Sequence, residues 1–259
     1  MTTNQPIGIF DSGVGGLSVW QTLREYLPNE NYIYFADSKH APYGTKSKEQ
    51  IIELSEANTK FLIQQQCKMI VVACNTATTN AIASLRFKFD LPFIGIEPAI
   101  KPAAAHSKTI GVLATKGTLS SDLFLDHPMK ENDDITIVEQ VGQGLVEMIE
   151  KGEIKTPKMK KQLTHLLQPM LEKKIDALVL GCTHYNFLRE VLAELLPSHI
   201  ELWDARAAIA KRTAFVLDQN GLRNDSSDAG VTRVLTNNSR TAIQDFIGAA
   251  VTVELIDKV

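Results

Sequence analysis

The sequence has few cysteines, almost no excess charge and no long apolar run. Only three of its 259 residues are cysteine, an odd number without the spacing of a disulfide framework, so we expect free thiols and a reducing, cytoplasmic setting. A formal net charge of -3 leaves no basic surplus for binding nucleic acid or an anionic membrane. No segment has the length of a membrane span, and the polar N-terminus lacks the pattern of a secretory signal.

Short β-type runs alternate with helical patterns along the whole chain, which predicts an α/β protein with mostly parallel sheets. A capping-box pattern at Ser47 and Gln50 predicts the start of one helix. The expected strands are Ile7–Phe10, Tyr32–Ala36, Met69–Ala73, Phe93–Ile96, Ile110–Ala114, Ile135–Val141, Ala177–Leu180, Glu201–Trp203, Thr232–Leu235 and Val251–Ile256.

Two segments of the first part of the chain recur, in the same order, in the second part. Ile7–Ser12 matches Ile110–Thr115, and Ile70–Thr76 matches Leu178–His184. Two such matches in register favour an internal duplication. We therefore expect two similar α/β domains related by pseudo-twofold symmetry, one formed by residues 1–97 plus 206–259 and the other by residues 98–205.

A glycine-rich loop, Asp11–Gly16, follows the first predicted strand. Ligands of open parallel sheets bind beyond the carboxyl ends of the strands, and glycines let backbone amides approach a ligand oxygen. The loop has neither the lysine of a phosphate-binding Walker loop nor the full dinucleotide-binding spacing. A carboxylate ligand fits it better than a nucleotide.

Cys74 and Cys182 each directly follow an apolar strand within the duplicated segments. A lone free cysteine is commonly a small buried hydrophobe, which is our interpretation of Cys67, but a matched pair at strand ends favours a function. Thiols need help to ionise near neutral pH. The duplication is imperfect at two positions that supply such help: Asp11 has no acidic counterpart, and His184 stands opposite a threonine.

Other chemistries fit these residues poorly. Cys-x-x-Cys and His-x-x-x-His pairs with zinc spacing are absent from the sequence, so we expect no metal. A cysteine hydrolase would use one nucleophile and leave the second cysteine segment without a purpose. A structural role for Asp11 as a helix cap, and for His184 as a buried hydrogen-bonding group, stays open at this point.

The chain resembles glutamate racemase over essentially its whole length, within a wider group of cofactor-independent racemases that includes aspartate racemases. The segments that carry the resemblance are Ile7–Ser18, Phe35–Asp37, Ala41–Thr45, Ala73–Ala77 and Leu180–Tyr185. The resemblance implies a cleft between two domains where L-glutamate and D-glutamate interconvert without a cofactor. One cysteine would remove the α-proton and the other would return a proton to the opposite face.

The resemblance also implies which residues act. It makes Cys74 and Cys182 the catalytic pair, assisted by Asp11, His184 and Glu150, with Glu147 one turn away as the alternative to Glu150. The substrate contacts it implies are Asp11, Ser12, Tyr43, Gly44, Asn75, Thr76, Thr118, Thr183 and His184.

Two departures and several expectations complete this interpretation. Asn186 stands where a proline usually follows His-Tyr, and Asp204–Arg206 replaces the usual late motif, which affects loop shape and not the reaction class. The expected partner is glutamate, a small molecule, with a homodimer compatible with the resemblance. Because the first strand starts at Ile7, we expect no activation by a cell-wall precursor through an N-terminal extension. The rival functions are an aspartate or related racemase and a non-catalytic two-domain binding protein.

Overall fold

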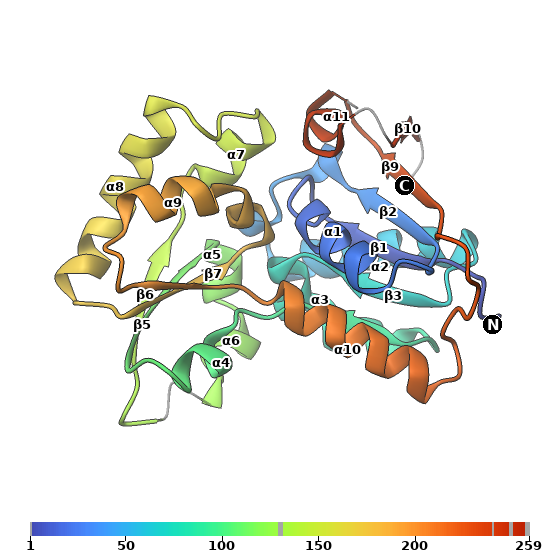
Figure 1. Ribbon diagram of the computed structural model, residues 1–259, viewed down its shortest axis with the longest axis horizontal. Helices are drawn as coiled ribbons and strands as arrows, with labels where there is room; N and C mark the ends of the chain where they lie inside the picture. Colours follow the sequence, from blue (N-terminus) through green and yellow to red (C-terminus); the bar gives the residue numbers. More distant parts are fainter. Residues whose placement is uncertain (1, 129–131, 240, 249–250, 257–259) are drawn as a thin grey trace.

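The computed structural model describes every residue except 1, 129–131, 240, 249–250 and 257–259. Its strands form two separate sheets that lie side by side, each with helices packed on it (Figure 1). Every strand pair described is parallel. The expected α/β class with parallel sheets is therefore confirmed.

The first sheet has six strands in the order β10-β9-β2-β1-β3-β4. Its strands are β1 (Ile7–Asp11), β2 (Tyr32–Ala36), β3 (Met69–Val72), β4 (Phe93–Gly95), β9 (Thr232–Thr236) and β10 (Val253–Leu255). The helices of this half are α1 (Leu17–Tyr26), α2 (Lys48–Gln64), α3 (Asn75–Lys88), α10 (Arg206–Gln219) and α11 (Thr241–Ile247), with the short 3-10 helices η1 (Ser38–His40) and η2 (Tyr43–Thr45).

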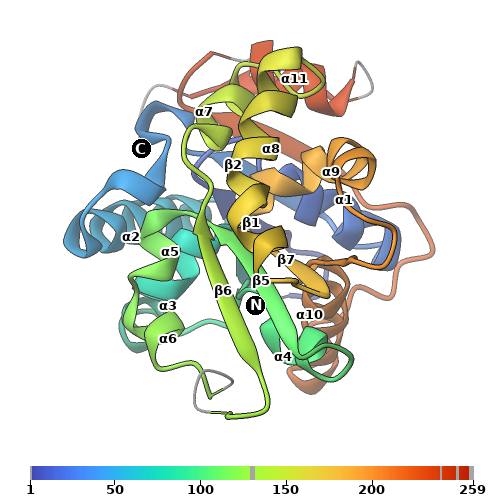
Figure 2. The same ribbon diagram turned by 90° about the vertical axis from the view of Figure 1, so that its left-hand side faces the viewer.

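The second sheet has four strands in the order β6-β5-β7-β8. They are β5 (Thr109–Ala114), β6 (Thr136–Val141), β7 (Ala177–Gly181) and β8 (Glu201–Trp203). The helices of this half are α4 (Ile100–Ala104), α5 (Lys116–Leu119), α6 (Asp122–Leu125), α7 (Leu145–Glu150), α8 (Pro157–Glu172) and α9 (Arg189–Leu195), with the 3-10 helix η4 (Thr183–Leu188). Figure 2 shows β6 at the edge of this sheet, beside β5.

The strand order β6-β5-β7-β8 repeats the order β2-β1-β3-β4 of the first sheet, as the sequence duplication predicts. β9 and β10 then extend the first sheet beyond β2. All ten expected strands form, with ends that differ by one or a few residues: β6 begins at Thr136 and β10 covers only Val253–Leu255. The proposed domain limits, 1–97 plus 206–259 and 98–205, stay a prediction.

Apolar runs explain why the central strands form where they do. β1, β2, β3 and β7 are buried along their whole length, the pattern of strands covered by helices on both faces. Alternate side chains serve opposite layers: Ile9 packs in a cluster with Leu17 of α1, whereas Phe10 packs in a cluster with Leu62 of α2 and Leu85 of α3. The ends of these strands, where the sequence places the candidate site residues, are therefore held by helix layers on both faces.

One end of α2 confirms the expected capping box. The Ser47 hydroxyl accepts a hydrogen bond from the Gln50 backbone, and the Gln50 side chain accepts one from the Ser47 backbone. Among the described residues, no helix is both long and apolar enough to span a membrane.

Candidate active site

The carboxyl ends of the central strands of both sheets carry the polar residues singled out in the sequence. Asp11 ends β1, and Cys74 begins the turn from β3 into α3. In the second half, Thr115 follows β5 and Cys182 follows β7. Parallel strands direct these ends to one edge of each sheet, and the hydrogen bonds described below join the two edges.

Cys74 is a buried thiol that caps a helix. Its Sγ accepts a hydrogen bond from the backbone N–H of Ala77 over 3.5 Å and lies 3.8 Å from the hydroxyl of Ser12. Burial raises the pKa of the Cys74 thiol, and the negative charge of Asp11 raises it further, against the lowering effect of the Ala77 N–H. The charge of Cys182 is a smaller cause that raises the same pKa.

Asp11 is fully buried and joins the two halves. One carboxylate oxygen accepts the backbone N–H of Gly13 at 2.7 Å, and the other accepts the hydroxyl of Thr183 at 3.0 Å. Burial raises the pKa of Asp11 to about 6, although the charge of His184 and the Gly13 hydrogen bond act to lower it. The residue can therefore change its protonation state near neutral pH.

Cys182 belongs to a chain of polar groups that ends in the first half. Its Sγ lies 3.8 Å from Nδ1 of His184, whose Nε2 lies 2.6 Å from an Oε1 of Glu150. That oxygen also accepts the backbone N–H of Val14 at 2.8 Å. Burial lowers the pKa of His184, but its hydrogen bonds to Cys182 and Glu150 outweigh burial and hold the pKa well above 6.5.

The two glutamates of α7 have different surroundings. Glu150 hydrogen-bonds to His184, whereas Glu147 is exposed and lines a cavity. The geometry favours Glu150 as the partner of the imidazole.

Two glycines make this approach between the halves possible. A Cβ on Gly13 would lie 1.8 Å from the Glu150 carboxylate, and a Cβ on Gly15 would lie 2.3 Å from Nδ1 of His184. Contacts this short are not tolerated. Glu150 and His184 of the second half can therefore pack against the loop after β1 only because the loop has no side chain at these two positions.

A cluster of three threonine hydroxyls forms a further link. Thr76 Oγ1 lies 2.8 Å from Thr115 Oγ1 and 3.2 Å from Thr118 Oγ1, and the latter two lie 3.0 Å apart. All three side chains are buried. Our sequence interpretation missed Thr115, although the duplication aligns it with Ser12.

The remaining expected ligand contacts differ in how free their side chains are. The hydroxyl of Tyr43 donates to Asp37 and accepts the amide of Asn58, so it is already engaged within the first half. The amide of Asn75 donates to the carbonyl of Ile96 at 3.3 Å. Gly44 lies against Thr115, where a Cβ would come within 2.7 Å of the threonine Cβ. Contact of Tyr43 and Gly44 with a ligand stays a prediction.

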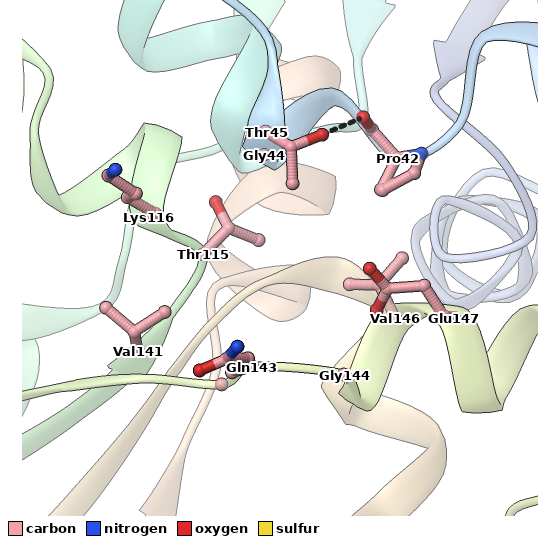
Figure 3. Close-up of a pocket in the computed structure, with 11 residues that line it drawn as sticks. Pro42, Gly44, Thr45, Thr115, Lys116, Val141, Gln143, Gly144, Val146 and Glu147 are labelled. Atoms are coloured by element: carbon pink, nitrogen blue, oxygen red, sulfur yellow. Dashed lines mark hydrogen bonds between the residues drawn. The ribbon is translucent and has the colours of Figure 1, made fainter.

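A cavity of about 350 Å³ opens between the two halves at this edge (Figure 3). The first half contributes Pro42, Gly44 and Thr45, and the second half contributes Thr115, Lys116, Val141–Gly144, Val146 and Glu147. Neither Cys74 nor Cys182 lines it, and these cysteines are only 5% and 6% exposed. Both sulfurs are therefore enclosed by the protein in this structure.

One more contact across the halves has no signal in the sequence. The amide of Asn186 on η4 donates to the hydroxyl of Ser18 on α1 over 3.2 Å. In the sequence, Asn186 is unusual only in its place after His-Tyr, and Ser18 is only part of a motif. Among the described residues, no group of three or more His, Cys, Asp or Glu side chains is arranged to hold a metal ion.

Each of the two duplicated α/β halves has a central strand that is followed by a thiol, with an acid or base beside that thiol. This arrangement defines the class of racemases that move a proton with two bases. The model of the Asp/Glu/Hydantoin racemase family matches residues 7–213, and the chain belongs to this family. A glutamate racemase of Herpetosiphon aurantiacus is 43% identical over 236 residues, which cover 90% of this chain and 93% of that protein.

Two solved structures show the same fold over nearly the whole chain. The glutamate racemase of Bacillus anthracis has a TM-score of 0.89 and 28% identity, with 98% of each chain covered. The glutamate racemase of Francisella tularensis, solved in complex with D-glutamate, has a TM-score of 0.85 and 31% identity, with 98% of each chain covered.

Proposed function

We propose that this protein interconverts L-glutamate and D-glutamate without a cofactor, using Cys74 and Cys182 as its two bases. One observation carries the proposal: the loop beneath Cys74 and the loop that bears Cys182 are joined directly, through the 3.0 Å hydrogen bond from Thr183 to Asp11. This contact brings the two thiol loops together, and we assign one thiol to each face of a ligand held between the halves. The family membership and the glutamate racemases among its relatives support glutamate as the substrate.

The reaction is a proton exchange at the α-carbon. One sulfur, as thiolate, takes the α-proton and becomes a thiol, while the electron pair of the broken C–H bond passes into the α-carboxylate. The opposite thiol gives its proton to the other face of the carbon and becomes the thiolate. Atoms and charge balance, the configuration is inverted, and the reverse reaction exchanges the two roles.

The proton partners of the two sulfurs are chemically different. Beside Cys182, His184 carries the positive charge that its high pKa favours, and Glu150 holds the imidazole in place. Beside Cys74, burial raises the pKa of the thiol and the charge of the Asp11 carboxylate raises it further, which favours the protonated sulfur in the closed site. We expect the two reaction directions to respond differently to pH as a result.

The carbanion-like transition state needs preorganised donors, because no electron sink such as pyridoxal phosphate takes part. The buried hydroxyls of Ser12, Thr76 and Thr183 and the amide of Asn75 lie beside the two thiol loops. We assign them to the α-carboxylate and ammonium groups. Even a rate gain of ~10⁶ asks these contacts and the positioning of the substrate for about 8 kcal/mol.

The proposed product, D-glutamate, is a building block of bacterial cell-wall peptidoglycan. We propose a cytoplasmic enzyme, consistent with free cysteines at Cys67, Cys74 and Cys182. Its partners would be small molecules, with a second copy of the chain as the one macromolecular partner that the family resemblance suggests.

The first prediction tests both thiols. Wild-type protein in heavy water should replace the α-hydrogen of L-glutamate and of D-glutamate with deuterium and invert both, as followed by proton nuclear magnetic resonance and circular dichroism. Cys74→Ser and Cys182→Ser should each lower the racemisation kcat by ~10² to 10⁴, because a hydroxyl is a far weaker acid than a thiol. Cys67→Ser, a buried cysteine away from these loops, is the matched control.

Three outcomes would contradict the proposal. Unchanged racemisation in both serine variants would remove the two-thiol mechanism. Faster turnover of aspartate than of glutamate would favour the aspartate racemase alternative. Tight binding of glutamate without any exchange of its α-hydrogen would favour a non-catalytic binding protein.

A further inference from the structure

The 3-10 helix η4, which follows Cys182, is held to the first half by side-chain contacts that include the following three. The Thr183 hydroxyl donates to Asp11, and the Asn186 amide donates to Ser18. The ring of Phe187 lies against that of Phe246 on α11, with centroids 4.3 Å apart. The Asp11 contact belongs to the proposed reaction, and the ring contact is apolar packing. The Asn186 contact has no assigned role.

The hydrogen bonds fix which way the Asn186 amide faces. Its Nδ2 lies 3.1 Å from the carbonyl oxygen of Thr183, and a carbonyl only accepts, so the nitrogen must face that oxygen. The Ser18 hydroxyl donates to the carbonyl of Gly15 at 2.8 Å and more weakly to the carbonyl of Thr183 at 3.4 Å, which leaves its oxygen free to accept from Asn186. The Asn186 amide and the Ser18 hydroxyl together tie the Thr183 backbone to the start of α1.

The same residue is a poor choice for stability alone. Asn186 is 9% exposed, and its Oδ1 is buried without a hydrogen-bond partner. An unsatisfied buried acceptor costs about 1–3 kcal/mol. A side chain that carries this cost while both protons of its amide bridge two halves points to a role in geometry.

We propose that Asn186 is a positioning residue that sets the register of the Cys182 loop against the loop after β1. It acts through the carbonyl of Thr183, which lies between the thiol of Cys182 and the imidazole of His184 in the chain, and through Ser18 beside Gly15. Because Gly15 packs against His184, the contact between Asn186 and Ser18 sets how the His184 imidazole is placed relative to the sulfur of Cys182. The inference rests on the proposed racemase function and adds a residue to it.

The test removes the donor while keeping the shape. Asn186→Asp replaces the NH₂ group that faces Thr183 with a carboxylate oxygen, which repels that carbonyl. We expect kcat at pH 8 to fall about tenfold in both directions, with KM changed less than twofold, because substrate contacts stay intact. Burial raises the pKa of a new carboxyl, and a protonated carboxyl can donate again. The ratio of variant to wild-type kcat should therefore recover as pH is lowered toward 6.

The comparison with wild type isolates the new carboxyl. The titratable groups around η4 include Cys182, His184 and Tyr185 on its own loop, Asp11 on β1, and Glu147 and Glu150 on α7. All are present in both proteins, so the ratio of kcat values reports what the substitution changes. A flat ratio between pH 6 and 8, or a wild-type kcat at pH 8, would overturn the assignment.

A second pair of variants separates position from stability. Asn186→Leu removes the donor together with the unsatisfied acceptor, so Tm should stay within a few degrees of wild type or rise, while kcat still falls about tenfold. Phe187→Leu, the neighbouring control, should lower Tm without any recovery at low pH, because it loses only ring packing with Phe246. A fall in kcat that follows Tm in every variant would show a structural role and refute the positioning role.

Hydrogen–deuterium exchange of residues 182–188 distinguishes this inference from the function on which it rests. Faster exchange in Asn186→Asp, in a protein whose wild type does not racemise glutamate, would refute the function and support the link. Unchanged exchange and unchanged kcat, in a wild type that does racemise glutamate, would refute the link alone.

Discussion

The two cysteine loops occupy equivalent places in the two halves but have different neighbours. Cys74 begins a 14-residue α-helix and accepts a backbone N–H from its first turn, whereas Cys182 begins a six-residue 3-10 helix and makes no such bond. Cys74 has Ser12 beside it and the charge of Asp11 nearby, and Cys182 has the imidazole of His184. The duplicated fold supplies two sulfurs in matching positions, and the residues that differ supply the distinct proton partners.

Asp11 and His184 also differ in how their ionisation affects the stability of the folded protein. Asp11 has a raised pKa because burial disfavours its charge, so its ionised form destabilises the folded protein. His184 has a raised pKa because Cys182 and Glu150 outweigh burial, so its charged form stabilises the folded protein. The following predictions use this opposition, from the largest expected loss of activity to the smallest.

Among the three substitutions that follow, replacing His184 should have the largest effect on activity. His184→Asn removes the positive charge 3.8 Å from the sulfur of Cys182, and we expect kcat/KM to fall by ~10² to 10³. The stabilisation from protonated His184 is fully present below pH 6.5 and is lost as pH rises through its higher folded pKa. The variant should therefore also have a lower Tm than wild type at pH 7, measured by calorimetry.

His165→Asn, on the exposed face of α8, is the matched control and should change neither quantity. A His184→Asn variant with wild-type kcat/KM in both directions would contradict the asymmetry between the two loops.

Replacing Asp11 should have a smaller effect on activity and the opposite effect on stability. In Asp11→Asn the amide oxygen can still accept the Gly13 N–H, and the NH₂ group can donate to the Thr183 hydroxyl in the reverse direction, so we expect kcat to fall ~10- to 100-fold. The folded pKa of about 6 exceeds the ordinary 3.8, so the folded state binds more protons between these values and wild-type stability falls as pH rises from about 4 to 6. The variant lacks this loss and should be more stable at pH 7 by up to about 3 kcal/mol.

Denaturant titrations at pH 4, 5, 6 and 7 measure this difference. Asp228→Asn, at an exposed position in the loop before β9, provides the comparison. A destabilised Asp11→Asn at pH 7 would mean that the hydrogen bonds of the carboxylate outweigh the cost of burying it.

The threonine cluster should give the smallest effect. Thr115→Val keeps the shape of the side chain but removes the hydroxyl that contacts Thr76 and Thr118 and caps α5. We expect KM for glutamate to rise about two- to tenfold, which is the range of one neutral hydrogen bond, with little change in kcat. Thr109→Val, at the start of β5, the strand that precedes Thr115, is a control outside the cluster. An unchanged KM would exclude the cluster from substrate binding.

Much of the fold could be predicted because it depends on local patterns. Apolar runs such as those of β1 and β7 fix strands that are buried on both faces, and Ser47 with Gln50 fixes a helix start. The duplicated segments predict the shared strand order of the two sheets. The two cysteines could be proposed for the same reason, because a residue that directly follows a buried parallel strand lies at the ligand-binding edge.

The contacts between the halves could not be predicted in this way. Ser18 and Asn186 lie 168 positions apart in the chain, and neither stands out by residue type or spacing. Val14 and Glu150 lie 136 positions apart, so the choice between Glu150 and Glu147 needed the packing of α7 against the loop after β1. Thr115 was within reach of the sequence, since the repeat aligns it with Ser12.

By itself, the sequence determined the α/β class, the repeated strand order and the presence of a thiol at the end of a central strand in each half. These follow from hydrophobic period and from local backbone preferences, which act over a few residues. Only the tertiary structure decided which polar groups meet, that His184 is charged and that Asp11 is costly to ionise. Those properties depend on burial and on charges brought together from distant parts of the chain, and no local pattern records them.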